Sequence, residues 1–173
     1  MRKVIHRILI VAILTLFSLP IASAHGDGNP QTISNLYIMI IAILTSLFSY
    51  MLLKEWINFQ SEIFTPLTFS LALYTGTVHI LLGLDDSLLL VGGLGIYGIL
   101  FLTIFAKLNQ QTTHISWISL LLILMSMFVA YFVSNPDIHY IVEDYLGLSS
   151  KLSEGLLMFL LYVRNNPSKN NNS

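Results

Sequence analysis

Long uninterrupted runs of apolar residues, separated by short polar segments, dominate the hydropathy pattern of this chain. The runs cover Ser34–Leu53, Pro66–Ala106 and Ile115–Ser134, with a shorter one at Leu152–Val163. A helix needs about 17–25 apolar residues to cross the hydrocarbon core of a bilayer. Since the second run is about twice that length, we expect it to form two helices that turn at Gly83–Ser87. The pattern predicts an all-α, polytopic transmembrane helical bundle of about five spans.

The last apolar run is the weakest of the predicted spans. Leu152–Val163 is short and is interrupted by Glu154 and Gly155, so we expect a tilted or half-inserted helix there. The residues after it, 165–173, are polar and rich in Asn, which predicts a disordered tail. The predicted transmembrane domain is therefore residues 34–164.

The N-terminus has the pattern of a secretory signal peptide. A basic segment, Met1–Arg7, precedes the apolar Ile8–Leu19 and the small-x-small triplet Ala22-Ser23-Ala24. We expect residues 1–24 to be removed, leaving a mature chain that begins at His25 with a short outer segment, residues 25–33. The alternative is an uncleaved first transmembrane helix, because the apolar stretch is only slightly short for a span.

The amino-acid composition excludes several classes of function. Hydrophobic residues make up 55% of the chain and charged residues only 10%, which indicates an integral membrane protein. No basic run of useful length lies beyond the N-terminus, so nucleic-acid binding is not expected. The chain has no cysteine, so any metal must bind through nitrogen and oxygen. No Ser-His-Asp set, phosphate loop or paired catalytic carboxylate is present, and we do not expect an enzyme.

Basic residues set the expected orientation in the cell membrane. If the mature N-terminus lies outside, Lys54, Lys107, Arg164 and Lys169 all fall inside, and only Lys151, expected in the loop Asn135–Lys151, falls outside. This distribution agrees with the positive-inside rule. It predicts a multi-pass protein whose C-terminus lies inside.

One imidazole and two carboxylates interrupt the second apolar run. His79, Asp85 and Asp86 lie where an ionisable group costs roughly 2.5–3.5 kcal/mol near a helix centre, so their presence suggests function. In an unbroken helix His79 and Asp86 would be about 10.5 Å apart along the axis, too far for one ion. Chelation would require the helix to unwind around Gly83, as broken helices do in transporters.

A structural explanation of the same residues stays open. Asp86 would then cap the next helix at its positive end, and both aspartates would belong to a solvated turn. In that case His79 would be a packing residue, hydrogen-bonded to a neighbouring carbonyl or to Tyr74 or Thr77.

This stretch also resembles a known family. Membrane proteins of the HupE/UreJ type, hydrogenase and urease accessory proteins regarded as nickel permeases, carry a Gly-x-x-His-Ile-x-x-Gly-x-Asp-His-Leu-Leu motif. The matching positions here are Gly76, His79, Ile80, Gly83, Asp85, Leu88 and Leu89, with the two leucines displaced by one residue after Ser87. Asp86 stands where the family has its second His. The resemblance implies uptake of a divalent transition metal, nickel first and cobalt or copper behind it. His79, Asp85 and Asp86 would form the entry or selectivity site.

His25 is a second candidate metal ligand. If cleavage exposes it, its α-amine and imidazole can chelate one divalent ion together. This residue also supports an alternative function: a non-transporting membrane subunit or metal chaperone that presents His25 to a larger metalloenzyme. A purely structural membrane protein is the third alternative. The glycine-rich stretch Gly92–Gly98 predicts close helix packing, which could also support a homo-oligomer.

Overall fold

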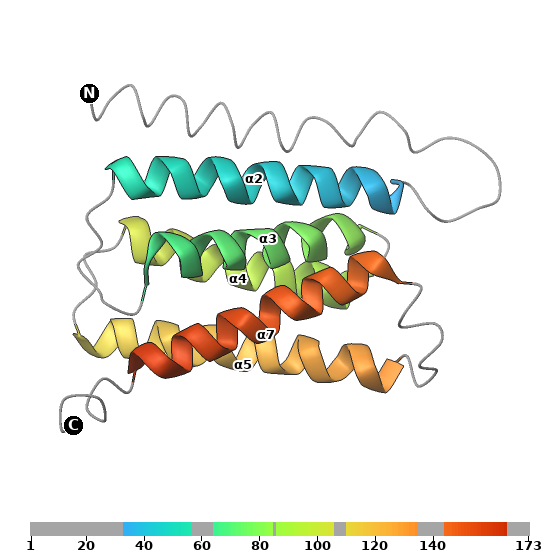
Figure 1. Cartoon of the computed structure of the whole chain (residues 1–173). Coiled ribbons are helices and arrows are strands. Elements are labelled where there is room, and N and C mark those ends of the chain that lie inside the picture. The colour runs from blue at the N-terminus through green and yellow to red at the C-terminus, as the bar shows by residue number, and fades with distance from the viewer. Residues whose placement is uncertain (1–32, 57–63, 85, 106–109, 135–143, 166–173) are drawn as a thin grey trace, which may run out of the picture. The chain divides into compact units, whose positions relative to one another are not determined.

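The computed structural model describes residues 33–56, 64–84, 86–105, 110–134 and 144–165. Its elements are five helices: α2 (Asn35–Trp56), α3 (Pro66–Leu82), α4 (Ser87–Phe105), α5 (Gln110–Ser134) and α7 (Tyr145–Asn165) (Figure 1). The described part of the chain contains no strand, so the all-α prediction is confirmed. The expected signal peptide, residues 1–24, and nearly all of the expected tail lie outside the described residues.

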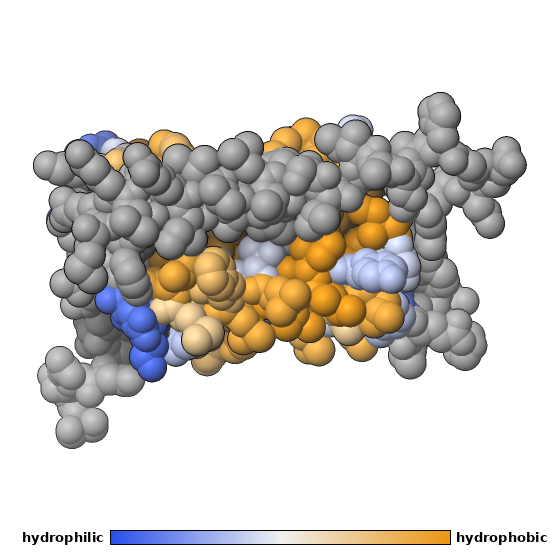
Figure 2. All heavy atoms as spheres, turned by 90° about the horizontal axis from the view of Figure 1, so that it is seen from above, coloured by the Kyte–Doolittle hydropathy of each residue, from blue (hydrophilic) through white to orange (hydrophobic). Residues whose placement is uncertain are grey.

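The described helices have the length and surface of a membrane protein. Four of them, α2, α4, α5 and α7, are long and apolar enough to cross a membrane, and α3 is a shorter apolar helix of 17 residues. Large apolar side chains point outward, among them Val133 (75% exposed), Val91 (70%) and Leu88 (69%). Figure 2 shows an apolar middle on the visible described surface, with hydrophilic residues towards its ends. The protein is therefore membrane-embedded.

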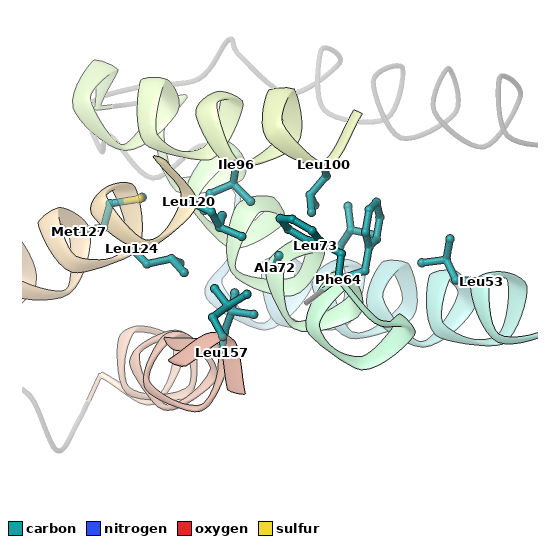
Figure 3. Close-up of a cluster of buried hydrophobic side chains, with 12 residues drawn as sticks. Leu53, Phe64, Ala72, Leu73, Ile96, Leu100, Leu120, Leu124, Met127 and Leu157 are labelled. Atoms are coloured by element: carbon teal, nitrogen blue, oxygen red, sulfur yellow. The ribbon is translucent and has the colours of Figure 1, made fainter. Parts of the chain in front are cut away.

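Helix α3 lies at the centre of the described bundle, where it contacts α2, α4 and α7. Its start is well defined, because Thr65 and Thr68 form a reciprocal capping box and Pro66 occupies the first turn. Its apolar residues enter a core shared with the neighbouring helices (Figure 3). That core contains Leu53, Phe64, Phe69, Ala72, Leu73, Ile96, Leu100, Leu120, Leu124, Met127, Leu157 and Leu161.

Glycine allows α3 and α4 to pack closely. A Cβ on Gly93 would lie 2.8 Å from the backbone nitrogen of Ile80 and 2.9 Å from the carbonyl oxygen of Gly76. The expectation that the glycine-rich stretch serves helix packing is thereby confirmed at Gly93. At the hairpin turn, a Cβ on Gly83 would collide with the backbone of Leu90. The turn between the helices therefore requires glycine at this position.

The hairpin turn was predicted correctly, but the last helix was not. Helix α7 has 21 residues and begins at Tyr145, so the expectation of a short piece at Leu152–Val163 is wrong. The expected outer loop Asn135–Lys151 is too long for the same reason, and Lys151 is a buried helical residue. The hydropathy pattern underestimates this span because the first half of α7 carries polar side chains. Those side chains find hydrogen-bond partners inside the bundle, which a hydropathy pattern does not show.

Candidate intramembrane site of His79, Lys151 and Glu154

Helix α7 carries a polar stripe on the face that points into the bundle. Gly147, Ser150, Lys151 and Glu154 recur at helical spacing, and all four are buried. The same face also buries Leu146, Leu157 and Leu161, whereas Leu152, Phe159 and Tyr162 point outward. This arrangement keeps the charges of Lys151 and Glu154 out of the lipid.

Glu154 is the centre of the site and is fully buried. Its Oε1 lies 2.6 Å from Nε2 of His79 on α3 and 2.8 Å from Nζ of Lys151. Thr75 and Ser150 donate to the same oxygen at 2.9 Å and 3.3 Å, and Nζ of Lys151 also reaches Oε2 at 2.9 Å. A carboxylate that accepts this many donors beside an ammonium group is stabilised in its ionised form.

Lys151 joins this carboxylate to α5. Its Nζ donates to the carbonyl oxygen of Met127 at 3.2 Å and lies 5.4 Å from the ring centroid of Tyr131. The Tyr131 hydroxyl donates to Oδ2 of Asp144 at 3.0 Å, at the residue that precedes α7. The ammonium therefore lies between one buried carboxylate and the face of an aromatic ring.

His79 has one occupied and one unoccupied ring nitrogen. Since the ammonium of Lys151 lies beside the Glu154 carboxylate, we assign Glu154 as ionised and Nε2 of His79 as the N–H that donates to Oε1. In the neutral ring the lone pair is then on Nδ1, which is buried and has no hydrogen-bond partner among the described residues. A histidine that binds a metal through one nitrogen usually donates the other N–H to a carboxylate. His79 has that arrangement.

The other sequence-predicted ligands are placed differently. Asp86 is exposed, and its Oδ1 accepts the backbone N–H of Leu88 at 2.9 Å, as expected for a residue that caps α4. Asp85 and His25 lie outside the described residues. Across the described ranges, no group of three or more His, Cys, Asp or Glu side chains is placed to hold a metal ion. The three-residue set of His79, Asp85 and Asp86 therefore stays a prediction.

Neither hydroxyl expected beside His79 bonds to its ring in the described contacts. Tyr74 is hydrogen-bonded to Ser149 at 2.8 Å, and Thr77 to Tyr97 at 2.7 Å. His79 pairs instead with Glu154, which is 75 residues away in the sequence.

Sequence reasoning missed Glu154 and Lys151 as site residues. The hydropathy pattern predicts that Glu154 interrupts a weak span and that Lys151 lies in a loop. The available signal was their spacing: two opposite charges three residues apart, with Ser150 and Ser153 beside them, inside an apolar segment. His79 was singled out because an ionisable group is costly in a membrane span. The same argument applies to Lys151 and Glu154.

In comparisons with known protein families, curated proteins and solved structures, nothing matches the chain.

Proposed function

We propose that this membrane-embedded protein takes up a divalent transition metal, and that Nδ1 of His79 is a ligand of the ion during passage. The observation that carries this proposal is the state of the His79 ring. Its Nε2 is fixed by a 2.6 Å contact to Glu154, while Nδ1 is buried without a partner among the described residues. The carboxylate orients the ring and raises the basicity of the free nitrogen.

The free-energy cost of burying ionisable side chains supports a functional role for the site. Three ionisable side chains are buried in the bundle: His79 is 3% exposed, Lys151 4% and Glu154 0%. Well-packed apolar residues in place of a buried ion pair are often neutral or stabilising, so packing alone does not favour such a group. Intramembrane ionisable residues commonly lie on ion or proton pathways.

The chemistry of the donors restricts the metal. Imidazole nitrogen suits nickel, copper and zinc, and carboxylate oxygen adds affinity for harder ions. Together with the resemblance at His79, this favours nickel first, with cobalt or copper as further substrates. Asp85 and Asp86 would supply oxygen ligands if the hairpin opens at Gly83, whose N–H now donates to the carbonyl oxygen of His79 at 2.8 Å.

The same proposal includes the orientation of the protein in the membrane. With Lys151 inside α7, the basic residues near the helix ends, Lys54, Lys107, Arg164 and Lys169, all fall on one side in a five-span arrangement. The positive-inside rule makes that side cytoplasmic, with the mature N-terminus outside. The hairpin turn at Gly83 then faces outward, on the side from which an ion would enter.

Uptake of radiolabelled Ni²⁺ into proteoliposomes tests the function. The informative variant is His79→Gln, because the glutamine amide can still donate to Glu154 but offers no imidazole lone pair. His114→Gln is the matched control, since His114 is exposed and stacks only on Trp117 among the described ring contacts. We expect uptake by the wild type and by His114→Gln, and loss of uptake in His79→Gln at equal membrane abundance.

Two results would contradict the proposal. If the wild type shows no uptake but binds Ni²⁺, the protein is a metal-binding subunit or chaperone. If His79→Gln transports as well as the wild type, His79 is a packing residue and the site is structural.

A further inference from the structure

Lys151 makes the contacts of a charged ammonium group. Its Nζ lies 2.8 Å and 2.9 Å from the two oxygens of Glu154 and 3.2 Å from the carbonyl oxygen of Met127. An ammonium has three N–H donors and no acceptor, so each donor has one oxygen within reach. A neutral amine has only two N–H groups, and its lone pair would face one of these oxygens. Lys151 therefore brings a full positive charge into the site.

This charge determines how many protons the pair of His79 and Glu154 holds. A neutral imidazole beside a carboxylate has one proton and one negative charge, which the ammonium balances. Lys151 is the permanent cation among the described contacts of Glu154, and all three side chains are buried. Without the ammonium, the pair would bury an unbalanced charge, which is strongly unfavourable at low dielectric constant. The pair would then become neutral by taking up a second proton.

The second proton would go to Nδ1 of His79. The first proton lies in the 2.6 Å contact between Nε2 and Oε1 of Glu154. The positions left are Nδ1 of the ring and Oε2 of the carboxylate, and an imidazole nitrogen is more basic than a carboxylate oxygen. Nδ1 would then be an N–H without a lone pair. This result is the same whether the first proton lies nearer to Nε2 or to Oε1.

We propose that Lys151 is a positioning residue that keeps Nδ1 of His79 unprotonated, because its ammonium supplies the positive charge that a second proton would otherwise bring to the pair. This inference rests on the proposed function, which uses the lone pair of Nδ1. It gives Lys151 a role that involves no ion at Glu154 and no contact between Lys151 and a metal.

Nitrogen NMR of the metal-free protein tests this inference. The full-length protein is labelled with ¹⁵N-histidine, reconstituted in lipid nanodiscs and measured at neutral pH, since protonated and unprotonated ring nitrogens give separate signals. The chain contains five histidines, and the spectrum of His79→Gln identifies the signals of His79 by their absence. In the wild type we expect a protonated Nε2 and an unprotonated Nδ1.

Three variants separate the charge of Lys151 from its hydrogen bonds and its packing. Lys151→Arg keeps the charge, Lys151→Gln keeps N–H donors without the charge, and Lys151→Met keeps only an unbranched side chain. We expect Nδ1 to be protonated in Lys151→Met and Lys151→Gln and unprotonated in Lys151→Arg. Lys151→Gln provides the same test if Lys151→Met does not reach the membrane. A protonated Nδ1 in the wild type, or a ring that does not follow the charge at position 151, overturns the proposal.

The absence of metal from this experiment separates the inference from the proposed function. If the ring follows the charge at position 151 but the wild type takes up no Ni²⁺, only the proposed function fails. If the wild type takes up Ni²⁺ and Nδ1 stays unprotonated in the charge-free variants, only the role of Lys151 is disproved.

Discussion

At the scale of single residues, the buried ion pair of Lys151 and Glu154 is costly to desolvate. Both side chains are buried, and each is neutralised mainly by the other, with Nζ and Oε1 2.8 Å apart. Removing one charge from such a pair leaves the other uncompensated in a medium of low dielectric constant. The loss of one partner should therefore be more harmful than the loss of both.

Glu154→Gln tests this directly. The amide can still accept from His79 and Thr75, but the ammonium of Lys151 loses its counter-charge, so we expect destabilisation by about 3–5 kcal/mol. The double variant Glu154→Gln with Lys151→Met should recover part of that loss, because no unpaired charge is left buried. Reversible denaturant unfolding in mixed micelles measures both values. A double variant less stable than Glu154→Gln would show that the two side chains are not coupled through charge.

The site illustrates what the sequence could and could not predict at this scale. His79 was identified because an imidazole stands out in an apolar run, and its side chain is a buried member of a polar cluster. Its partner could not be identified, because the contact to Glu154 joins residues 75 positions apart and depends on how α3 packs on α7. The capping role of Asp86 could be predicted from the sequence, since it depends only on the two residues that follow Asp86.

At the scale of elements, the hydropathy pattern was sufficient to predict a helix wherever that helix faces lipid on most sides. The expected span Ser34–Leu53 corresponds to α2, and Ile115–Ser134 corresponds to α5 apart from the polar first turn of that helix. The turn at Gly83–Ser87 lies where α3 ends and α4 begins. The length of helix α7 was underestimated because its polar residues face α3 and α5. A local hydropathy pattern does not reveal such contacts.

The packing of α3 on α4 gives a prediction at the same scale. Gly93→Ala would bring a Cβ to 2.8 Å from backbone nitrogen of Ile80, and backbone atoms cannot move aside without separating the helices. We expect a loss of about 1–3 kcal/mol in unfolding free energy. Gly98→Ala is the control, because a Cβ there meets nothing within 4 Å. Thermal unfolding of the two variants would contradict this account if Gly98→Ala were the less stable.

At the scale of the whole molecule, orientation decides whether the hairpin turn faces the incoming ion. The chain has no cysteine, so single cysteines can report it. Leu84→Cys, at the exposed turn, should react with an impermeant maleimide on intact cells. Gln110→Cys, at the exposed start of α5, should react only after permeabilisation. The reverse labelling pattern would place the turn at the cytoplasmic side and remove the proposed route of entry.

The central claim is that Nδ1 of His79 binds the metal while Glu154 holds Nε2. The most direct measurement is X-ray absorption at the nickel edge of Ni²⁺-loaded protein in nanodiscs, compared between the wild type and His79→Gln. We predict imidazole scattering around nickel in the wild type, and loss of that signal or of the bound ion in His79→Gln. Nickel bound with the same imidazole signal in both proteins would contradict the claim.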